Sequence, residues 1–259
     1  MIDIHCHILP NVDDGSESLE ESIEMAKIAE SEGITKIVNT SHCHFDFKYK
    51  KGNELKLELE KFNQVLKEEN INIEVLLGNE LYYTSDLIER FNELDFFSMN
   101  NSKYILMEFS PINFPKNIED VIYEIKIRGY IPIIAHAERY KQVQEDVNIV
   151  LDCIKEGALI QVNASSILGK NGEKAEDTSK KLLDNNMVHF VATDAHSSNR
   201  RRPLIKDSYN YILRNYGKEV SEKLFIENPT AVIENRDISI LNPTKYEEKR
   251  SFLKRLFRK

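Results

Sequence analysis

Short apolar segments alternate with longer segments of mixed polarity along most of this chain. Seven of the short segments are almost continuously apolar, which is typical of strands that are buried on both faces. They are Ile2–His5, Ile34–Ser41, Ile71–Gly78, Tyr104–Phe109, Ile131–Ala135, Ala158–Asn163 and Val188–Thr193. The segments between them have helical periodicity: Leu19–Glu32, Asn53–Glu69, Ser85–Leu94, Ile118–Arg128, Asp146–Glu156 and Glu173–Asn186.

This alternation predicts parallel strands that are joined by right-handed helical crossovers. The simplest such α/β architecture is a closed or nearly closed barrel with seven strands in place of the usual eight. An open, doubly wound sheet is the alternative. The first helix has its own boundary signals, because Ser18 and Glu21 have capping-box spacing and Gly33 is a plausible residue after its end.

No Gly-rich linker divides the chain before about residue 240, so we expect one domain over residues 1–240 and a tail over 241–259. From Lys245 the tail reads KYEEKRSFLKRLFRK, with seven basic and two acidic residues, whereas the whole chain has a net charge of -8. Its apolar residues recur at helical spacing: Phe252, Leu253, Leu256 and Phe257. Such a helix either packs on the domain or rests on anionic lipid at the inner face of a membrane.

Composition is that of an ordinary globular protein, with 41% hydrophobic and 30% charged residues among 259. The acidic balance disfavours nucleic acid as a partner, because nucleic-acid binding depends on basic residues. Three cysteines, Cys6, Cys43 and Cys153, argue against a disulfide framework and for a reducing compartment. With neither a signal peptide nor a long apolar segment, we expect a cytoplasmic protein.

Six of the seven histidines lie where predicted strands end. Two strands end in His-Cys-His, and alternate residues of an extended chain point the same way. In a parallel barrel all carboxyl ends of the strands share one mouth, so residues far apart in sequence should converge there. These residues are His5, His7, His42, His44, Glu80, Glu108, His136, Asp194 and His196. Imidazoles with carboxylates and no thiolate suit Zn, Fe or Mn, and so many ligands imply more than one ion.

Each of these residues has a structural interpretation when it is taken alone. A single His-x-His is a weak metal signal, and an isolated acid is more often a surface or salt-bridged residue; the metal hypothesis depends on their convergence. His189 lies inside a strand and is expected to be a core histidine, and His44 is as consistent with a supporting role as with ligation. The sequence lacks the motifs of other phosphatase and hydrolase mechanisms. No cysteine is followed six residues later by arginine, as a cysteine-dependent phosphatase requires, and no Asp-x-Asp pair is present for an aspartyl-phosphate mechanism. There is also no P-loop and no G-x-S-x-G elbow. Hydrolysis assisted by a metal ion is what remains.

Four segments together resemble the PHP (polymerase and histidinol phosphatase) superfamily. They are HCHILPNVDDGS at 5–16, Gly78–Glu80, His136–Arg139 and Thr193–His196. More closely, they resemble the bacterial protein-tyrosine phosphatases of capsule and exopolysaccharide clusters, the CpsB/YwqE group, over Met1 to about Asp237. The resemblance implies a distorted seven-stranded barrel of the PHP type.

The resemblance also implies three metal positions. His5, His7, Glu80 and Asp194 would hold the first ion; Glu80 would bridge to a second, with Glu108 and His136; and Asp14, His42 and His196 would hold the third. Asp14 comes from the resemblance alone, since strand-end reasoning does not find it. Arg139 and Arg202 match arginines that contact phosphate in this group, although Arg200, Arg201 and Arg202 form a triplet and the inward-pointing one is open.

The implied function is a phosphotyrosine-protein phosphatase with three divalent ions, Mn or else Fe or Zn, acting on the tyrosine-rich tail of a bacterial autokinase that controls polysaccharide export. A histidinol-phosphate-type phosphomonoesterase is the alternative enzyme, and a non-catalytic metal-bound docking module is a third hypothesis. Phe45, Phe47 and Tyr49 either pack against a phosphotyrosine ring or cover the barrel.

Overall fold

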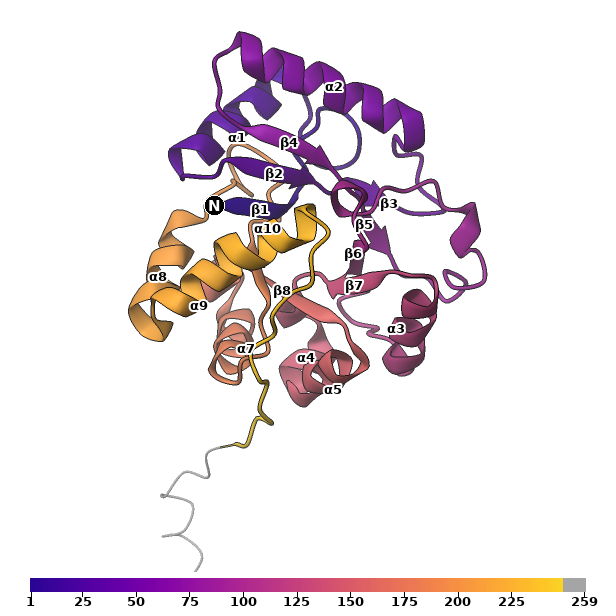
Figure 1. Ribbon diagram of the computed structural model, residues 1–259, viewed down its shortest axis with the longest axis vertical. Helices are drawn as coiled ribbons and strands as arrows, with labels where there is room; N and C mark the ends of the chain where they lie inside the picture. The colour runs from indigo at the N-terminus through magenta and orange to yellow at the C-terminus, as the bar shows by residue number, and fades with distance from the viewer. Residues whose placement is uncertain (249–259) are drawn as a thin grey trace, which may run out of the picture.

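The computed structural model of the protein describes residues 1–248. Its strands are β1 (Ile2–Cys6), β2 (Lys36–Asn39), β3 (His42–Cys43), β4 (Glu74–Leu77), β5 (Glu80–Tyr82), β6 (Tyr104–Glu108), β7 (Ile131–Ile134), β8 (Leu159–Asn163) and β9 (Phe190–Ala192). Its α-helices are α1 (Leu19–Ser31), α2 (Gly52–Glu68), α3 (Ile118–Ile127), α4 (Lys141–Glu145), α5 (Asn148–Glu156), α6 (Ala164–Ile167), α7 (Glu173–Asp184), α8 (Lys206–Tyr216), α9 (Lys218–Glu222) and α10 (Asn228–Ile233). Helices surround the strands (Figure 1).

The strands form two parallel sheets, ordered β1-β2-β4 and β3-β5-β6-β7-β8-β9. An isolated parallel bridge between Cys6 and Ala195 connects the end of β1 to the segment after β9. The N–H of His7 also donates to the carbonyl of Ala195 at 2.8 Å. The expected α/β fold with parallel pairing is therefore confirmed, but a single closed barrel of seven strands stays a prediction because the ladder is divided in two.

All seven predicted strands are present; β1 ends one residue later than predicted, and the other six are slightly shorter. Two further strands, β3 and β5, were wrongly predicted as loops. Two residues separate each of them from the strand before it, at the point where the pairing passes from one sheet to the other. There His42 pairs in register with Glu80, and the N–H of Glu80 lies 3.2 Å from the carbonyls of Thr40 and Ser41. The sheet itself thus places two proposed ligands side by side.

The helix predicted at Ser85–Leu94 was wrong. The segment forms turns and a 3-10 turn, Phe91–Glu93, because only Leu87 and Phe91 are well buried there. A short segment with so little apolar anchoring does not sustain a helix. The other five predicted helices are present. The helices after residue 200, α8, α9 and α10, were not predicted, and neither were the short helices α4 and α6. For α1, the expected boundary is confirmed: the Ser18 side chain accepts the N–H of Glu21 at 3.1 Å, and Gly33 has a φ of +84°.

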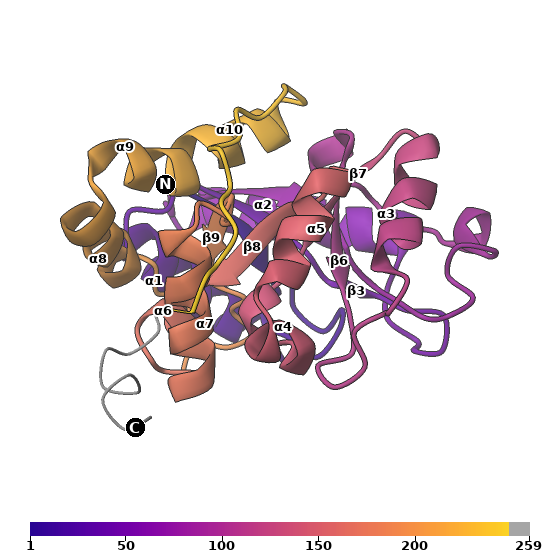
Figure 2. The same cartoon turned by 90° about the horizontal axis from the view of Figure 1, so that it is seen from below.

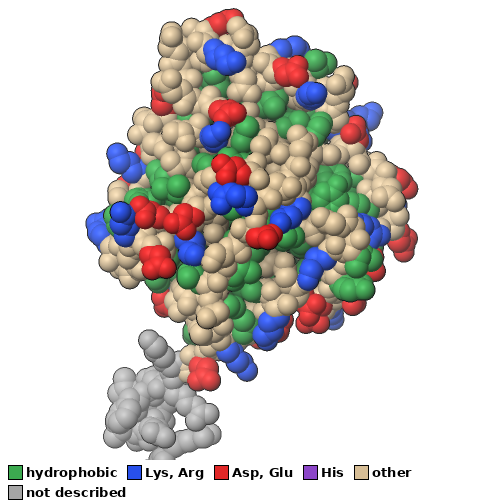
Figure 3. Space-filling model, viewed as in Figure 1, with side chains coloured by type: hydrophobic (Ala, Val, Ile, Leu, Met, Phe, Trp, Pro, Cys, Tyr) green, Lys and Arg blue, Asp and Glu red, His purple; other side chains and the backbone are tan. Residues whose placement is uncertain are grey.

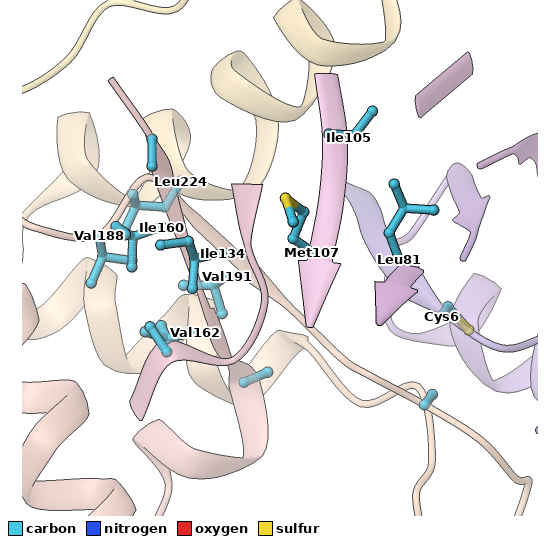
Figure 4. Packing of buried hydrophobic residues seen from close by; sticks show 14 of the residues in the cluster. Cys6, Leu81, Ile105, Met107, Ile134, Ile160, Val162, Val188, Val191 and Leu224 are labelled. Carbon is cyan, nitrogen blue, oxygen red and sulfur yellow. The ribbon is translucent and has the colours of Figure 1, made fainter. Parts of the chain in front are cut away.

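Two apolar clusters lie on opposite faces of the strands. Alternate side chains of β6 show the division, because Tyr104 and Leu106 belong to the inner cluster while Ile105 and Met107 belong to the outer one (Figure 4). The inner cluster is covered by Val232 and Ile233, the latter at the end of α10. Burial of one such side chain contributes roughly 1.5–3 kcal/mol. The two clusters hold the strand ends, and hence the site, in a fixed frame.

After α10 the chain runs back past β8 towards α7 (Figures 1 and 2). The N–H of Thr244 donates to the carbonyl of Asn185, and that of Tyr246 donates to the Asn148 side chain. The amphipathic helix predicted for the tail falls mainly on residues 249–259, which lie outside the described residues. Among residues 1–248, no helix combines the length and the apolarity needed to cross a membrane.

Candidate metal centre

Glu80 lies at the centre of a group of imidazoles. Its Oε2 is 3.3 Å from Nε2 of His5, 3.3 Å from Nε2 of His7 and 3.1 Å from Nδ1 of His42. Its Oε1 is 3.2 Å from Nε2 of His136. The Glu80 side chain is only 1% exposed, and neither oxygen accepts a conventional hydrogen bond from the described residues. A carboxylate buried in this way requires positive charge beside it.

The three other carboxylates of the predicted set surround this centre. Asp194 Oδ1 is 3.4 Å from Nε2 of His5, and Glu108 Oε1 is 3.4 Å from Nε2 of His136. Asp14 Oδ1 is 3.3 Å from Nε2 of His42 and 3.6 Å from Nε2 of His196. All nine residues that the family resemblance assigns to the three ions therefore lie in one cluster.

The cluster contains three compact groups, and within each group the ligand atoms all lie within 4.8 Å of one another. The groups are His7, Asp14, His42 and His196; His5, His7 and Glu80; and His42, Glu80 and Glu108. They overlap the three predicted sets but differ in detail. His7 joins the Asp14 group, His42 takes the place expected for His136, and Asp194 belongs to none. His44 is outside all three groups, and its Nδ1 accepts the N–H of Asp46 instead.

Unusual backbone angles at two positions and a close backbone contact at a third shape the site. His136 has a φ of +34° and Asp194 a φ of +53°, left-handed values that non-glycine residues seldom adopt. Such conformations cost about 1–3 kcal/mol each and concentrate at functional sites. Gly15 packs directly behind His7: a Cβ there would lie 2.4 Å from the carbonyl oxygen of His7. Only glycine lets this loop bring Asp14 so near the imidazoles.

A layer of polar residues supports the imidazoles from behind. Asp13 Oδ2 lies 2.7 Å from Nδ1 of His7 and accepts the N–H of His42 at 2.9 Å. Gln161 Oε1 lies 3.1 Å from Nδ1 of His5 and accepts the N–H of His136 at 2.8 Å. Such partners fix which imidazole nitrogen is free to ligate a metal. Neither Asp13 nor Gln161 was predicted to have this role.

Asn163 completes the support from β8. It donates from Nδ2 to Asp194 Oδ2 at 2.8 Å and accepts from Gln161 at 2.8 Å. The sequence contains a pattern that points to this supporting role, because Gln161 and Asn163 are polar residues at alternate positions of a strand that is otherwise apolar.

The electrostatics of the cluster follow from burial and close opposite charges. Burial alone would lower the pKa of His7, but the Asp13 carboxylate outweighs it and raises that pKa to about 9. For His136, burial is likewise outweighed by Glu108 and Glu80, and the pKa rises to about 10. Burial would raise the pKa of Glu80, yet the histidines hold it well below its usual range. The Glu80 carboxylate thus remains ionised and attracts either protons or metal cations to the imidazoles.

The donors fit divalent transition metals. They are imidazole nitrogens and carboxylate oxygens, the set that suits Zn, Fe and Mn. All three cysteines are buried free thiols, and Cys6 and Cys43 belong to the apolar core. His189 stays apart, as expected: it is buried inside the fold, and its Nδ1 accepts the N–H of Ile160 at 3.0 Å.

Arginines lie beside the centre. Arg139 Nη1 is 3.0 Å from Asp194 Oδ2, and Arg201 Nη2 is 2.6 Å from Asp194 Oδ1. Both line a cavity of about 440 Å³ that Arg200 and Arg202 also line. Of the triplet it is therefore Arg201 that bonds to the centre, whereas Arg202 is exposed and lines the cavity without an ion pair to any carboxylate of residues 1–248.

A second cavity, of about 290 Å³, opens on the other side of the cluster. Asp14, His42 and Glu108 form its polar wall, and His44, Phe47, Tyr49 and Tyr82 line the rest. The Phe47 and Tyr49 rings are stacked, with centroids 5.4 Å apart. Phe45 does not line this cavity; it packs against the core with the Arg90 guanidinium 3.9 Å from its ring centroid. Two of the three aromatic residues thus face the site and the third covers the fold.

Comparison with known proteins agrees with this chemistry. A family model described as "Capsular polysaccharide synthesis, CpsB/CapC" matches residues 1–234. Tyrosine-protein phosphatase CpsB of Streptococcus agalactiae is 34% identical over 250 residues, covering 92% of this chain and 100% of the relative. Tyrosine-protein phosphatase YwqE of Bacillus subtilis is 33% identical over 255 residues, covering 97% and 99%.

Solved structures give the same picture. A structure reported for YwqE from Bacillus subtilis and CpsB from Streptococcus pneumoniae, described as metal-dependent tyrosine phosphatases, superposes with a TM-score of 0.90 at 32% identity, covering 95% of this chain and 100% of that one. A histidinol phosphate phosphatase from Lactococcus lactis shares the fold, with a TM-score of 0.58 at 15% identity over 83% of this chain and 93% of its own.

Proposed function

This chain belongs to the CpsB/CapC family of capsular polysaccharide synthesis, and from that premise we propose that it is a metal-dependent protein-tyrosine phosphatase. The observation that carries the proposal is the buried Glu80 carboxylate, which four imidazoles surround between an arginine-lined and an aromatic cavity. The reaction is hydrolysis of the phosphate ester of tyrosine.

We assign three ions to the centre, held as the family resemblance implies. His5, His7, Glu80 and Asp194 would hold one, and Glu80, Glu108 and His136 another. The third would lie between Asp14, His42 and His196, whose ligand atoms form one of the compact groups. Mn is the metal we propose, with Fe and Zn as the alternatives that the donors also suit.

Bound divalent ions supply Lewis acidity and lower the pKa of a coordinated water to about 7. Side chains of the protein would bind and orient the substrate. Arg139 and Arg202 offset charge on the phosphoryl oxygens, as charge-assisted bonds do well, and Phe47 and Tyr49 flank the substrate ring. The phenol leaving group has a parent pKa of about 10, so no strong general acid is needed. No phosphoenzyme forms in this scheme.

The physiological substrate we propose is the tyrosine-rich tail of a bacterial autokinase. We place the activity in the cytoplasm, since all three cysteines are free thiols. The basic tail would bring the enzyme to anionic lipid. Full-length protein should co-sediment with anionic vesicles in low salt, and a chain ending at Asn242 should not.

We also propose that the two sheets act as one distorted barrel, because β2 continues into β3, β4 continues into β5, and the end of β1 pairs with the segment after β9.

Activity assays with and without added Mn test the assignment. We expect rapid hydrolysis of phosphotyrosine peptide, slow hydrolysis of histidinol phosphate, and loss of both on complete chelation. Faster cleavage of histidinol phosphate would assign the chain to small-molecule phosphomonoesterases. Metal binding without any hydrolysis would leave a docking module.

A further inference from the structure

The arginine-lined cavity carries more positive charge than one phosphoryl group needs. Among residues 1–248, the only carboxylate that lines it is Asp194, and the basic residues are Arg139, Lys170, Arg200, Arg201 and Arg202. The whole chain has a net charge of -8, so this local excess runs against the overall balance. On the face that Figure 3 shows, acidic and basic side chains are interspersed instead.

Two of these cations have no role in the proposed reaction. Arg139 and Arg201 are paired with Asp194, and Arg202 is assigned to the phosphoryl group. Lys170 and Arg200 are exposed, and neither has an ion-pair partner among residues 1–248. They add charge to the cavity wall from two separate loops.

Hydrogen bonds fix the backbone of both loops. On one side, the N–H of Lys170 donates to the carbonyl of Ser165 at 2.9 Å, and Asn171 Nδ2 donates to the Ser165 and Ser166 hydroxyls, both at 2.9 Å. On the other side, the Ser197 hydroxyl accepts the N–H of Arg200 at 3.2 Å. Because the backbone is already ordered, binding an anion here has to immobilise only side chains.

The cavity has room for a second group. Its volume of about 440 Å³ lies within the range of roughly 300–1,000 Å³ that accommodates small molecules. It shares Arg200 and Arg201 with a neighbouring cavity of about 430 Å³, which reaches Asp14 and His196. Asp14 also lines the aromatic cavity, so the three cavities adjoin in a row around the metal centre.

We propose that Lys170 and Arg200 form an anion subsite for a second negatively charged side chain of the same phosphotyrosine peptide, either a carboxylate or a phosphate. This inference rests on the proposed tyrosine-phosphatase function. A peptide along the row of cavities would place its phosphotyrosine ring against Phe47 and Tyr49 and a flanking acidic group against Lys170. The enzyme would then prefer acidic or multiply phosphorylated tyrosine segments.

Binding of non-hydrolysable peptides to metal-loaded full-length protein tests the subsite directly. Each peptide carries one difluorophosphonate analogue of phosphotyrosine, and the flanking positions hold neutral residues, a glutamate placed at each position in turn, or a second phosphonate. The variants are K170E combined with R200E, and as a matched control K56E combined with K67E, which makes the same charge change at two exposed lysines of α2. Turnover of p-nitrophenyl phosphate, which has no flanking residues, shows that the variants keep their basal activity.

Wild type and the K56E/K67E control should bind the best anionic peptide at least about fivefold more tightly than the neutral one, which corresponds to about 1 kcal/mol. The K170E/R200E variant should lose this preference, and so should wild type at 1 M salt, where the screening length falls to about 3 Å. The glutamate and phosphonate arms distinguish the two sources of charge. Equal binding of neutral and anionic peptides by wild type, or a preference that survives in the K170E/R200E variant, would overturn the subsite. Failure of wild type to hydrolyse any aryl phosphate would instead refute the proposed function, and the binding comparison would still decide on the subsite.

Discussion

Replacing Asp13 by asparagine tests whether the residues behind the imidazoles matter as much as the ligands themselves. Asp13 Oδ2 lies 2.7 Å from Nδ1 of His7 and 2.9 Å from the backbone nitrogen of His42. Its Oδ1 accepts the N–H of Gly15 at 3.0 Å. One carboxylate thus serves three donors and holds the proton of neutral His7 on Nδ1, which leaves Nε2 free towards the metal.

Asparagine has only one acceptor oxygen. With that oxygen in the place of Oδ2, the bonds to His7 and His42 survive, but the amide group faces the N–H of Gly15 and one bond is lost. The bond to His7 also becomes neutral, and neutral bonds are roughly half as strong as charge-assisted ones. Loss of such a supporting partner typically weakens metal binding about 10–100-fold, which corresponds to about 1.4–2.7 kcal/mol.

We therefore expect D13N to need about 10–100-fold more metal for half-maximal activity, with a nearly normal kcat at saturating metal. D13A leaves three donors without their partner, and each unsatisfied buried donor costs about 1–3 kcal/mol, so it should also unfold at lower temperature. The measurement is a titration of metal-free protein with Mn that records both bound metal and turnover of p-nitrophenyl phosphate. D152N makes the same chemical change on the exposed side of α5 and is the control. If D13N bound metal as tightly as wild type, the supporting role of Asp13 would be refuted.

Three further substitutions probe the centre and the core. E80Q should release two ions at once, because the proposed ions share this carboxylate; elemental analysis showing a full metal complement would contradict the bridge. R139A should lower kcat about 10²–10³-fold, the usual cost of one charge-stabilising donor, with metal content unchanged; parallel loss of metal would show that Arg139 is structural. Burial lowers the pKa of His189 to about 3, below the usual value of about 6.5, so the unfolded chain takes up its proton first as the pH falls. The stability that neutral His189 contributes is fully present above about pH 6.5 and is lost towards pH 3, by up to roughly 5 kcal/mol. H189N should flatten this acid slope in thermal melts, and an unchanged slope would exclude His189 as its source.

The strands and the convergence of the predicted ligands could be predicted because both follow from simple periodicities. Continuous apolar segments identify buried parallel strands, and parallel strands bring their carboxyl ends together. Neither argument depends on side-chain detail, and so Glu80 and His136 were placed in one site although more than fifty residues separate them. Glu80 and His42 were assigned to loops because strands as short as β3 and β5 leave no periodic signal.

The supporting layer was harder to find, because it depends on contacts that no local pattern specifies. Asp13 and Asp14 are adjacent and identical in type, yet Asp14 faces His42 and His196 while Asp13 lies behind His7. Nothing in a sequence of two aspartates decides which one turns inward. In the structure the choice is imposed by the loop at Gly15, whose missing side chain lets the backbone press against His7.

The connection between β1 and β9 shows why the metal centre and the fold are not separable in this protein. Asp194 adopts a left-handed backbone conformation that its own side chain does not favour. It is held there because its N–H donates to the carbonyl of His5 at 2.8 Å, and the carbonyl of the next residue, Ala195, accepts the N–H of His7 at 2.8 Å. The bonds that join the first strand to the last therefore also fix the backbone of His5, His7 and Asp194, whose side chains lie around Glu80. Because the strain at Asp194 is balanced by the packing of both strands, its geometry is set before any ion arrives, which is the preorganisation that tight and selective metal binding requires.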